Sequence, residues 1–345
     1  MSNSDEFGFN PDRLTGELKP LVPGAPAGLS APEEAYLRHY GIHFAEEVPN
    51  LTHQFGVIDG GGHRLAVHLW TPQDSTGTAL VIHGYYDHVG LYRHLIGHLI
   101  GRRVAVLTLD LPGHGLSSGA RATIDTFDHY VDAVDACLQA LAAHLPRPWH
   151  LVGQSMGGAI AMEWLLAKSV TRATSPFAGI ILLAPLVRPY LWPINRVFYE
   201  LIRRFVSQRP RTFADNSEDL EFLEFLRDRD PLQARILPVR WVTAMVAWKK
   251  RFVRYRPSDL SVLVVQGGSD RTVDSHYDLK VIQRLFDAKV LYIPEARHHL
   301  VNETATIRGQ MLAAIDEELD LRTVEFDLDT GSTAQGAYTV HPGRN

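Results

Sequence analysis

Short apolar runs rich in Val, Ile and Leu recur along the chain from residue 79 and alternate with longer segments of helical periodicity. The runs are apolar on both faces, which is typical of parallel strands that helices cover on both sides of a sheet. We expect these strands at residues 79–83, 104–109, 150–152, 179–183, 262–266 and 290–293. We expect the helices between them at residues 92–102, 126–144, 156–168, 276–286 and 304–321. This alternation predicts an α/β chain with a mainly parallel, doubly wound sheet.

Two further strands are expected before this alternation begins. Residues 54–59 and 64–70 flank Gly60-Gly61-Gly62, and a glycine turn between two such runs predicts an antiparallel hairpin. Together with the six later runs, this hairpin predicts an eight-stranded sheet.

The two ends of the chain are expected to lie outside the sheet. Ser30 and Glu33 have the spacing of a capping box, which predicts a short helix that ends near Gly41. The residues before that helix are polar and rich in proline. The first 30 residues are therefore predicted to be a loosely ordered arm, which together with the short helix makes up residues 1–45, and the polar residues 324–345 a flexible tail.

A long insertion interrupts the alternation after the strand at 179–183. Nearly eighty residues separate that strand from the next one, which is too many for a simple connection within a compact sheet. The segment is also too apolar for a linker, so we predict a mostly helical cap at 186–256. The core would then comprise 46–185 and 257–323.

Composition and charge narrow the class of protein. At 345 residues and 45% hydrophobic content, the chain can bury a large core. The formal charge is −5 and no Lys/Arg run is present, so we expect no nucleic-acid partner. The single cysteine, Cys137, excludes an intrachain disulfide. There is no secretory pattern and no apolar run of the ~20 residues that a membrane span needs, so a cytoplasmic location is expected.

The clearest chemical signal is Gly153-Gln154-Ser155-Met156-Gly157, which follows an expected strand and begins an expected helix. A serine on a tight strand-to-helix turn holds its hydroxyl clear of the sheet, and the glycines around it relieve crowding. This arrangement resembles the nucleophile elbow of α/β-hydrolases, which makes Ser155 the candidate nucleophile.

The partners of such a serine follow it along the chain, first an acid and then a histidine. Asp270 lies just beyond the strand at 262–266, and Asp274 is its rival four residues later. The loop after the last expected strand holds His298 and His299, and their spacing alone does not separate them. We favour Asp270 as the acid, which would orient a histidine that accepts the serine proton.

An oxyanion site needs two backbone N–H groups. One is expected from Met156, at the start of the helix after the elbow. The second is expected from Tyr85, where Gly84 lets the backbone come close.

With these residues in place, the chain resembles the monoacylglycerol lipase and lysophospholipase branch of the α/β-hydrolases over residues 56–321. The resemblance rests on a series of landmarks: His83-Gly84 with Asp87-His88, Asp110-Leu111-Pro112-Gly113-His114-Gly115-Leu116-Ser117, the elbow at Ser155, Asp230-Pro231-Leu232, Gly268-Ser269-Asp270-Arg271 and Ala296-Arg297-His298.

The resemblance implies roles for particular residues. It implies that His298 rather than His299 is the catalytic histidine, that Asp270 is the acid, and that the oxyanion N–H groups belong to Tyr85 and Met156. It assigns the loop of Asp110 and His114 to structure. The chain departs from the family pattern at Tyr85, where a small residue is usual, and the large ring is expected to narrow the acyl pocket or form its wall.

The expected function is hydrolysis of a carboxylic ester in a single-acyl lipid, a lysophospholipid or a monoacylglycerol, with no metal or organic cofactor. Tyr86, Trp192 and Trp241 are the candidate substrate contacts. Residues 186–256 hold 15 Lys/Arg against 8 Asp/Glu, so this basic cap is expected to contact an anionic membrane surface. The alternatives are a peptidase or amidase, a short-chain carboxylesterase, or a ligand-binding receptor or scaffold that kept the fold.

Overall fold

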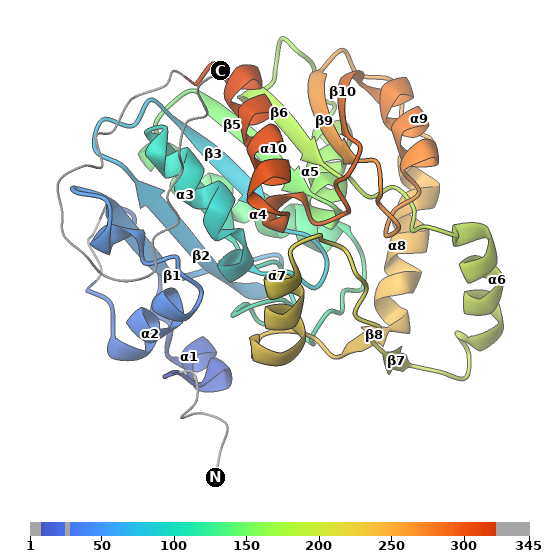
Figure 1. Cartoon of the computed structure of the whole chain (residues 1–345), viewed down its shortest axis with the longest axis horizontal. Coiled ribbons are helices and arrows are strands. Elements are labelled where there is room, and N and C mark those ends of the chain that lie inside the picture. Colours follow the sequence, from blue (N-terminus) through green and yellow to red (C-terminus); the bar gives the residue numbers. More distant parts are fainter. Residues whose placement is uncertain (1–7, 25–27, 322–345) are drawn as a thin grey trace.

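One eight-stranded sheet runs through the centre of the molecule (Figure 1). The computed structural model describes residues 8–24 and 28–321, so the expected tail at 324–345 lies outside the described residues. The strands are β1 (Thr52–Gly60), β2 (His63–Thr71), β3 (Gly77–Ile82), β4 (Val104–Leu109), β5 (Trp149–Gln154), β6 (Phe177–Leu183), β9 (Ser261–Gly267) and β10 (Asp287–Ile293). Their order is β1-β2-β4-β3-β5-β6-β9-β10; the β1–β2 and β2–β4 pairs are antiparallel and the rest parallel. The expected fold class is confirmed.

Helices cover both faces of this sheet. Those connecting the strands are α3 (Arg93–Gly101), α4 (Asp128–Leu141), α5 (Met156–Ala167), α9 (Ser275–Leu285) and α10 (Ala305–Glu318). Single 3₁₀ turns lie at Phe44–Glu46, Val89–Tyr92, Ala142–His144 and Leu300–Asn302. Helices α4, α5 and α9 pack on one face, and α3 and α10 on the other. Within residues 8–24 and 28–321, no helix is long and apolar enough to cross a membrane.

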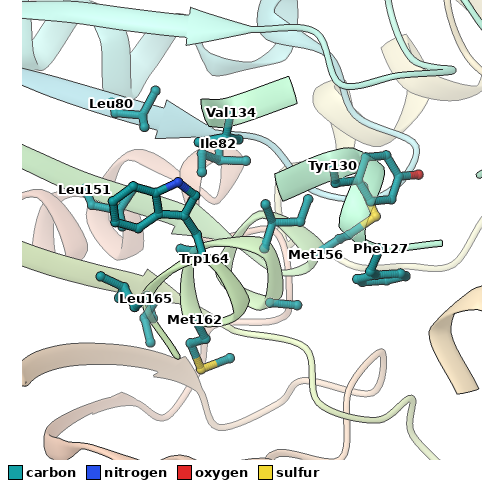
Figure 2. Packing of buried hydrophobic residues seen from close by; sticks show 14 of the residues in the cluster. Leu80, Ile82, Phe127, Tyr130, Val134, Leu151, Met156, Met162, Trp164 and Leu165 are labelled. Carbon is teal, nitrogen blue, oxygen red and sulfur yellow. The ribbon is translucent and has the colours of Figure 1, made fainter. Parts of the chain in front are cut away.

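Strand β3 shows why its sequence is apolar throughout. Leu80 and Ile82 are buried against the α4 and α5 layer, whereas Ala79 and Val81 are buried on the opposite face. Figure 2 shows Leu80 and Ile82 in the first of these layers, near Trp164 of α5. Because burying one such aliphatic side chain stabilises a fold by ~1.5–3 kcal/mol, both faces hold the strand in the interior.

The expectation of a loosely ordered N-terminal arm is wrong for the described part of the arm. Helix α1 (Pro11–Glu17) precedes α2 (Ala31–His39), whose predicted capping box is present. The side chains of Phe9, Leu14 and Leu18 are buried in the core, and Pro20 bridges to Val57 of β1. These buried apolar side chains and the backbone contact with β1 fix the described part of the arm against the sheet edge.

The insertion between β6 and β9 is mainly helical, as expected, but it also contains a small antiparallel pair of strands. It comprises α6 (Trp192–Ile202), β7 (Gln208–Pro210), α7 (Leu220–Glu224), a π-helical turn (Phe225–Arg229), β8 (Ile236–Pro238) and α8 (Val239–Phe252). The buried carboxylate of Glu163 on α5 accepts hydrogen bonds from Trp248 Nε1 at 2.9 Å and from Arg251 Nη2 at 2.6 Å. These contacts hold α8 on the core, while the division of the chain into arm, core and cap domains stays a prediction.

Candidate active site

Ser155 lies on a sharp turn between β5 and α5. Its φ of 53° is in the left-handed region, which costs a non-glycine residue energy. The turn is held by the Ser155 N–H, which donates to Leu183 O at 2.8 Å, and by the Ser155 carbonyl, which accepts from Leu186 N at 3.0 Å. A Cβ on Gly157 would lie 2.1 Å from Ile82 O, and one on Gly153 would lie 2.6 Å from Gly157 O. The expected need for glycine beside the serine therefore has a direct steric cause.

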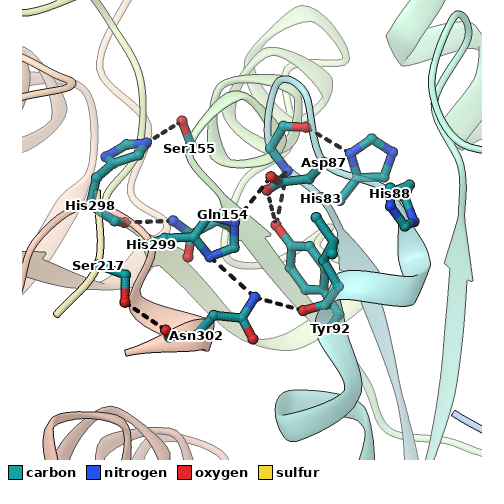
Figure 3. A network of polar contacts seen from close by, with 12 residues as sticks. His83, Asp87, His88, Tyr92, Gln154, Ser155, Ser217, His298, His299 and Asn302 are labelled. Carbon is teal, nitrogen blue, oxygen red and sulfur yellow. Dashed lines mark hydrogen bonds and ion pairs between the residues drawn. The ribbon is translucent and has the colours of Figure 1, made fainter. Parts of the chain in front are cut away.

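The structure brings Ser155, His298 and Asp270 into one hydrogen-bonded chain. His298 Nε2 lies 2.9 Å from Ser155 Oγ, and His298 Nδ1 lies 2.8 Å from Asp270 Oδ2 (Figure 3 shows the serine and the imidazole). With Nδ1–H donating to the carboxylate, Nε2 is free to accept the hydroxyl proton. All three residues are buried, and His298 O accepts from Gln154 Nε2 at 2.8 Å, which fixes the histidine loop beside the elbow.

The surroundings of the two residues favour a deprotonated carboxylate at Asp270 beside a basic imidazole at His298. Burial would raise the pKa of Asp270, but the charge and hydrogen bond of His298, with the N–H groups of Thr272 and Val273, lower it below its ordinary value. Burial would lower the pKa of His298, but the charge and hydrogen bond of Asp270 and the charge of Asp87 raise it. The carboxylate therefore stabilises an imidazolium if the ring takes up a proton.

The two rivals from the sequence are engaged elsewhere. Asp274 accepts from Tyr277 N at 3.1 Å as the N-cap of α9, and it forms an ion pair with Arg188 at 2.6 Å. His299 Nε2 donates to Asp87 Oδ1 at 3.0 Å. Neither side chain takes part in the chain that reaches Ser155.

The loop after β3 comes close to the serine at Gly84. A Cβ there would lie 3.4 Å from Ser155 Cβ and 2.7 Å from Asp87 Oδ2. The backbone N–H groups of Tyr85 and Met156 have no hydrogen-bond acceptor among the described residues. Two N–H donors are thus left free on the segments that flank the hydroxyl.

Asp87 organises this loop, a role that sequence reasoning missed. Its Oδ2 accepts from Tyr92 OH at 2.9 Å and from Gly84 N at 3.2 Å, while Oδ1 accepts from His299 (Figure 3). Burial would raise the pKa of Asp87, but the charges of His299 and His83 and the hydrogen bonds of His299 and Tyr92 lower it. The sequence marked Asp87 as a landmark but gave no sign of its partners.

A second buried pair joins the same loop to the insertion. His88 Nε2 lies 3.0 Å from Asp230 Oδ2, with both side chains inaccessible to solvent. Tyr40 OH, at the end of α2, donates to Asp230 Oδ1 at 2.7 Å. Segments that lie far apart in the sequence therefore converge behind the loop after β3.

The expected substrate contacts have different surroundings. The Tyr85 ring stacks on Trp241 of α8, with centroids 3.7 Å apart and planes at 16°, and its OH donates to Ala122 O at 2.8 Å. The Tyr86 ring lies 4.0 Å from that of Tyr85. Trp192 is buried elsewhere in the insertion, with Lys249 Nζ 5.9 Å from its ring. Tyr85, Tyr86 and Trp241 thus form one aromatic group beside the loop, whereas Trp192 lies in another part of the insertion.

A surface hollow of about 770 Å³ lies elsewhere, at the amino ends of β5, β6 and β9. Arg147, Trp149 and Phe177 are among the residues that line it. Parallel strands place their carboxyl ends, and with them Ser155, at the opposite edge of the sheet. The hollow therefore has no part in the chemistry at the serine.

Known proteins share this framework. The family model described as serine aminopeptidase, S33, matches residues 73–305. Human monoglyceride lipase is 30% identical over 264 residues, which cover 72% of this chain and 83% of that protein. Phospholipase YtpA of Bacillus subtilis is 28% identical over 219 residues, covering 61% of this chain and 82% of that protein.

The fold is also found in solved structures. A soluble variant of monoglyceride lipase from Saccharomyces cerevisiae, in complex with a substrate analogue, matches with a TM-score of 0.65 and 20% sequence identity. The match covers 79% of this chain and 95% of that one. The extent of the family match and the identity to the human lipase show that this chain belongs to the serine aminopeptidase (S33) family of α/β-hydrolases, with lipases among its relatives.

Proposed function

We propose that this protein is a serine ester hydrolase that cleaves a single-acyl lipid, a lysophospholipid or a monoacylglycerol, through an acyl-enzyme intermediate. The observation that carries the proposal is the continuous chain from Ser155 Oγ through His298 to Asp270, with separations of 2.9 and 2.8 Å. A serine hydroxyl alone is a poor nucleophile at neutral pH, and an oriented imidazole base corrects this.

The reaction has two halves. Ser155 Oγ attacks the ester carbonyl and forms a C–O bond, while its proton moves to His298 Nε2. The bond from the acyl carbon to the leaving alcohol then breaks, and the imidazolium returns the proton to the alcohol oxygen. A water molecule next gives a proton to His298 and attacks the acyl carbon. The bond from that carbon to Ser155 Oγ breaks and the imidazolium returns the proton to Oγ, which releases the fatty acid and restores the serine.

The negative charge that forms on the carbonyl oxygen during attack needs hydrogen-bond donors to stabilise it. The unpaired N–H groups of Tyr85 and Met156 are proposed to supply them, because the segments that carry them flank the hydroxyl. Met156 is also the first residue of α5, where the helix dipole favours negative charge. Removal of one such donor typically costs ~100–1,000-fold in rate.

The outer surface of the insertion supports a lipid substrate. Helix α6 exposes the apolar side chains of Ile194, Val197, Phe198 and Leu201 along one side, and Phe205 is exposed just beyond the end of the helix. Arg196 lies on the same helix and Arg204 just beyond its end. Figure 1 shows α6 standing away from the sheet. Exposed apolar area beside cationic side chains suits an anionic lipid surface, so we place the peripheral membrane contact there.

The relatives support the same substrate class. Human monoglyceride lipase and the Bacillus subtilis phospholipase carry lipid-hydrolase names, and the proposal extends that class to this chain. The family description as a serine aminopeptidase favours a second candidate, a peptidase acting at an N-terminal residue. Turnover of amino-acid arylamides without turnover of lipid esters would select that candidate.

A labelling experiment tests the nucleophile. A fluorophosphonate probe should label the wild-type protein and the Ser207→Ala control, in which an exposed serine of the insertion is changed. Ser155→Ala should abolish labelling and lower turnover of p-nitrophenyl esters by about a million-fold, because the members of a triad act as a unit. Labelling that survives in Ser155→Ala would exclude this serine as the nucleophile.

A substrate panel tests the lipid assignment. Monoacylglycerols, lysophospholipids and short p-nitrophenyl esters are to be compared with the wild-type protein. Higher kcat/KM for the lipids is the expected result. Activity on the short esters alone would exclude the lipid assignment and leave a short-chain carboxylesterase.

A further inference from the structure

Two arginines lie side by side where the β7–β8 pair of the insertion ends. Arg211 follows β7 and Arg235 precedes β8, and Arg211 N donates to Arg235 O at 2.9 Å. The Arg211 guanidinium lies 4.3 Å from the centre of the Phe213 ring, and that of Arg235 lies 5.0 Å from the same ring. Two positive charges are therefore grouped around one aromatic side chain.

Neither guanidinium forms an ion pair in the described part of the chain. Within residues 8–24 and 28–321, no Asp or Glu oxygen lies within ion-pair distance of Arg211 or Arg235. Arg211 Nη1 donates to Gln233 Oε1 and to Ala234 O, whereas Nε and Nη2 have no acceptor among the described residues. Arg211 is half-buried, and this burial lowers its pKa despite the opposing influence of Tyr86 and of the charges of Asp87 and Asp230. A shielded cation with unused donors is costly unless an anion joins it.

Arg211 is also close to the candidate active site. Its guanidinium lies 3.9 Å from the centre of the Tyr86 ring, which is 4.0 Å from the ring of Tyr85. Tyr85 follows Gly84, the residue that approaches Ser155. Three consecutive residues of the loop after β3, Gly84, Tyr85 and Tyr86, thus connect the surroundings of Ser155 with those of Arg211.

We propose that Arg211, supported by Arg235, is an anion subsite that binds the phosphate of a lysophospholipid whose ester carbonyl lies at Ser155. This inference rests on the proposed function and deepens it, because it selects an anionic headgroup over a neutral glycerol. A guanidinium presents its N–H groups as a planar fork that matches two phosphate oxygens. A monoacylglycerol offers no charge at that position, so Arg211 discriminates between two lipids that share the same acyl chain.

The test compares two substrates with identical chains, palmitoyl lysophosphatidylglycerol and monopalmitoylglycerol, in mixed micelles of a neutral detergent. Arg211→Gln should lower kcat/KM for the phospholipid by about 10- to 100-fold relative to the glyceride, the range expected for lost charge-assisted hydrogen bonds. Arg211→Lys, which keeps the charge but not the fork, should restore part of that ratio. An unchanged ratio, or an equal loss on both substrates, would overturn the inference and leave Arg211 as a support for Tyr86.

A matched control must separate general attraction of a cationic side chain to the anionic micelle from binding at the proposed subsite. Arg254 is an exposed arginine beyond the end of α8 with no ion pair in the described part of the chain, and Arg254→Gln removes the same charge. The substrate ratio should stay at the wild-type value in this variant. A ratio that falls equally in Arg254→Gln and Arg211→Gln would show attraction to the micelle rather than a subsite. Thermal unfolding of each variant checks that it is folded.

A binding measurement separates this inference from the proposed function. An alkyl glycerophosphate and an alkyl glycerol with the same chain are ethers that contain no carboxylic ester, so calorimetry measures their binding without turnover. The alkyl glycerophosphate should bind more tightly than the alkyl glycerol, and Arg211→Gln should remove that difference. If the difference is present in a protein that hydrolyses neither ester, the function fails and the subsite stands. Inorganic phosphate that binds as tightly as the alkyl glycerophosphate would identify a free-anion site and overturn the lipid assignment.

Discussion

Replacing Asp270 with asparagine tests the acid of the triad, and the contacts of its carboxylate predict the outcome. Oδ2 accepts from His298 Nδ1 at 2.8 Å and from Gln266 Nε2 at 3.0 Å. Oδ1 accepts from Thr272 N at 2.7 Å and from Val273 N at 3.2 Å. Every donor around the group points at an oxygen, so the site is built for a carboxylate.

An amide cannot reproduce this arrangement because only one of its two ends accepts hydrogen bonds. In either orientation, its NH₂ group faces two of the four donors, which then lose their acceptor in a buried site. Each unsatisfied donor costs ~1–3 kcal/mol, so Asp270→Asn should lower the free energy of unfolding by about 2–6 kcal/mol. If the NH₂ group faces His298, the ring is driven to the tautomer with its proton on Nε2, and it cannot accept the serine proton. Turnover should then fall by roughly 10⁴-fold.

The assay is kcat for a p-nitrophenyl ester, with urea unfolding of the same samples. Asp274→Asn is the control, because asparagine still caps α9 and only the ion pair with Arg188 is lost. Its kcat should stay near the wild-type value. A kcat that survives in Asp270→Asn but collapses in Asp274→Asn would refute the assignment of the acid.

Three further outcomes are expected. His298→Ala should match the loss of turnover in Ser155→Ala, whereas His299→Ala should lower turnover only mildly. Steady-state kinetics of both variants checks this, and the reverse result would make His299 the base. Because the pKa of His298 is raised and only its neutral form accepts a proton, kcat/KM should rise with pH to a plateau, with a midpoint above ~6.5, the ordinary pKa of histidine; a midpoint below that value would contradict the influence of Asp270. Gly157→Ala should lower the free energy of unfolding by ~1–3 kcal/mol or more, because the added methyl would lie 2.1 Å from Ile82 O. Gly309→Ala, in an open position on α10, should instead raise the free energy of unfolding slightly. Urea unfolding measures both, and equal effects of the two changes would contradict the steric argument.

The insertion illustrates how far sequence patterns reach. Its length and apolar content indicated a helical segment, and α6, α7 and α8 are present. The β7–β8 pair was missed because each strand is only three residues long and carries no alternation of its own. The first part of the N-terminal arm was misjudged for a similar reason, since the buried side chains of Phe9, Leu14 and Leu18 do not dominate its polar composition.

The sequence by itself determined the sheet and the elbow. Strands that are apolar on both faces, helical periodicity between them, and glycines around Ser155 are properties of neighbouring residues, and their physical causes are local. Positions after strand ends, which parallel topology brings to one edge, led to Asp270 and to the pair His298 and His299; the family resemblance then selected His298.

Only the tertiary structure decided which groups touch across that edge. Three features depend on segments that lie far apart in the sequence. These are the contact of Asp87 with His299, the contacts of Tyr40 and His88 with Asp230, and the absence of an ion pair at Arg211 among the described residues. No periodicity encodes such pairs, because they arise where separate loops and the insertion close over the sheet and each buried polar group must find a partner.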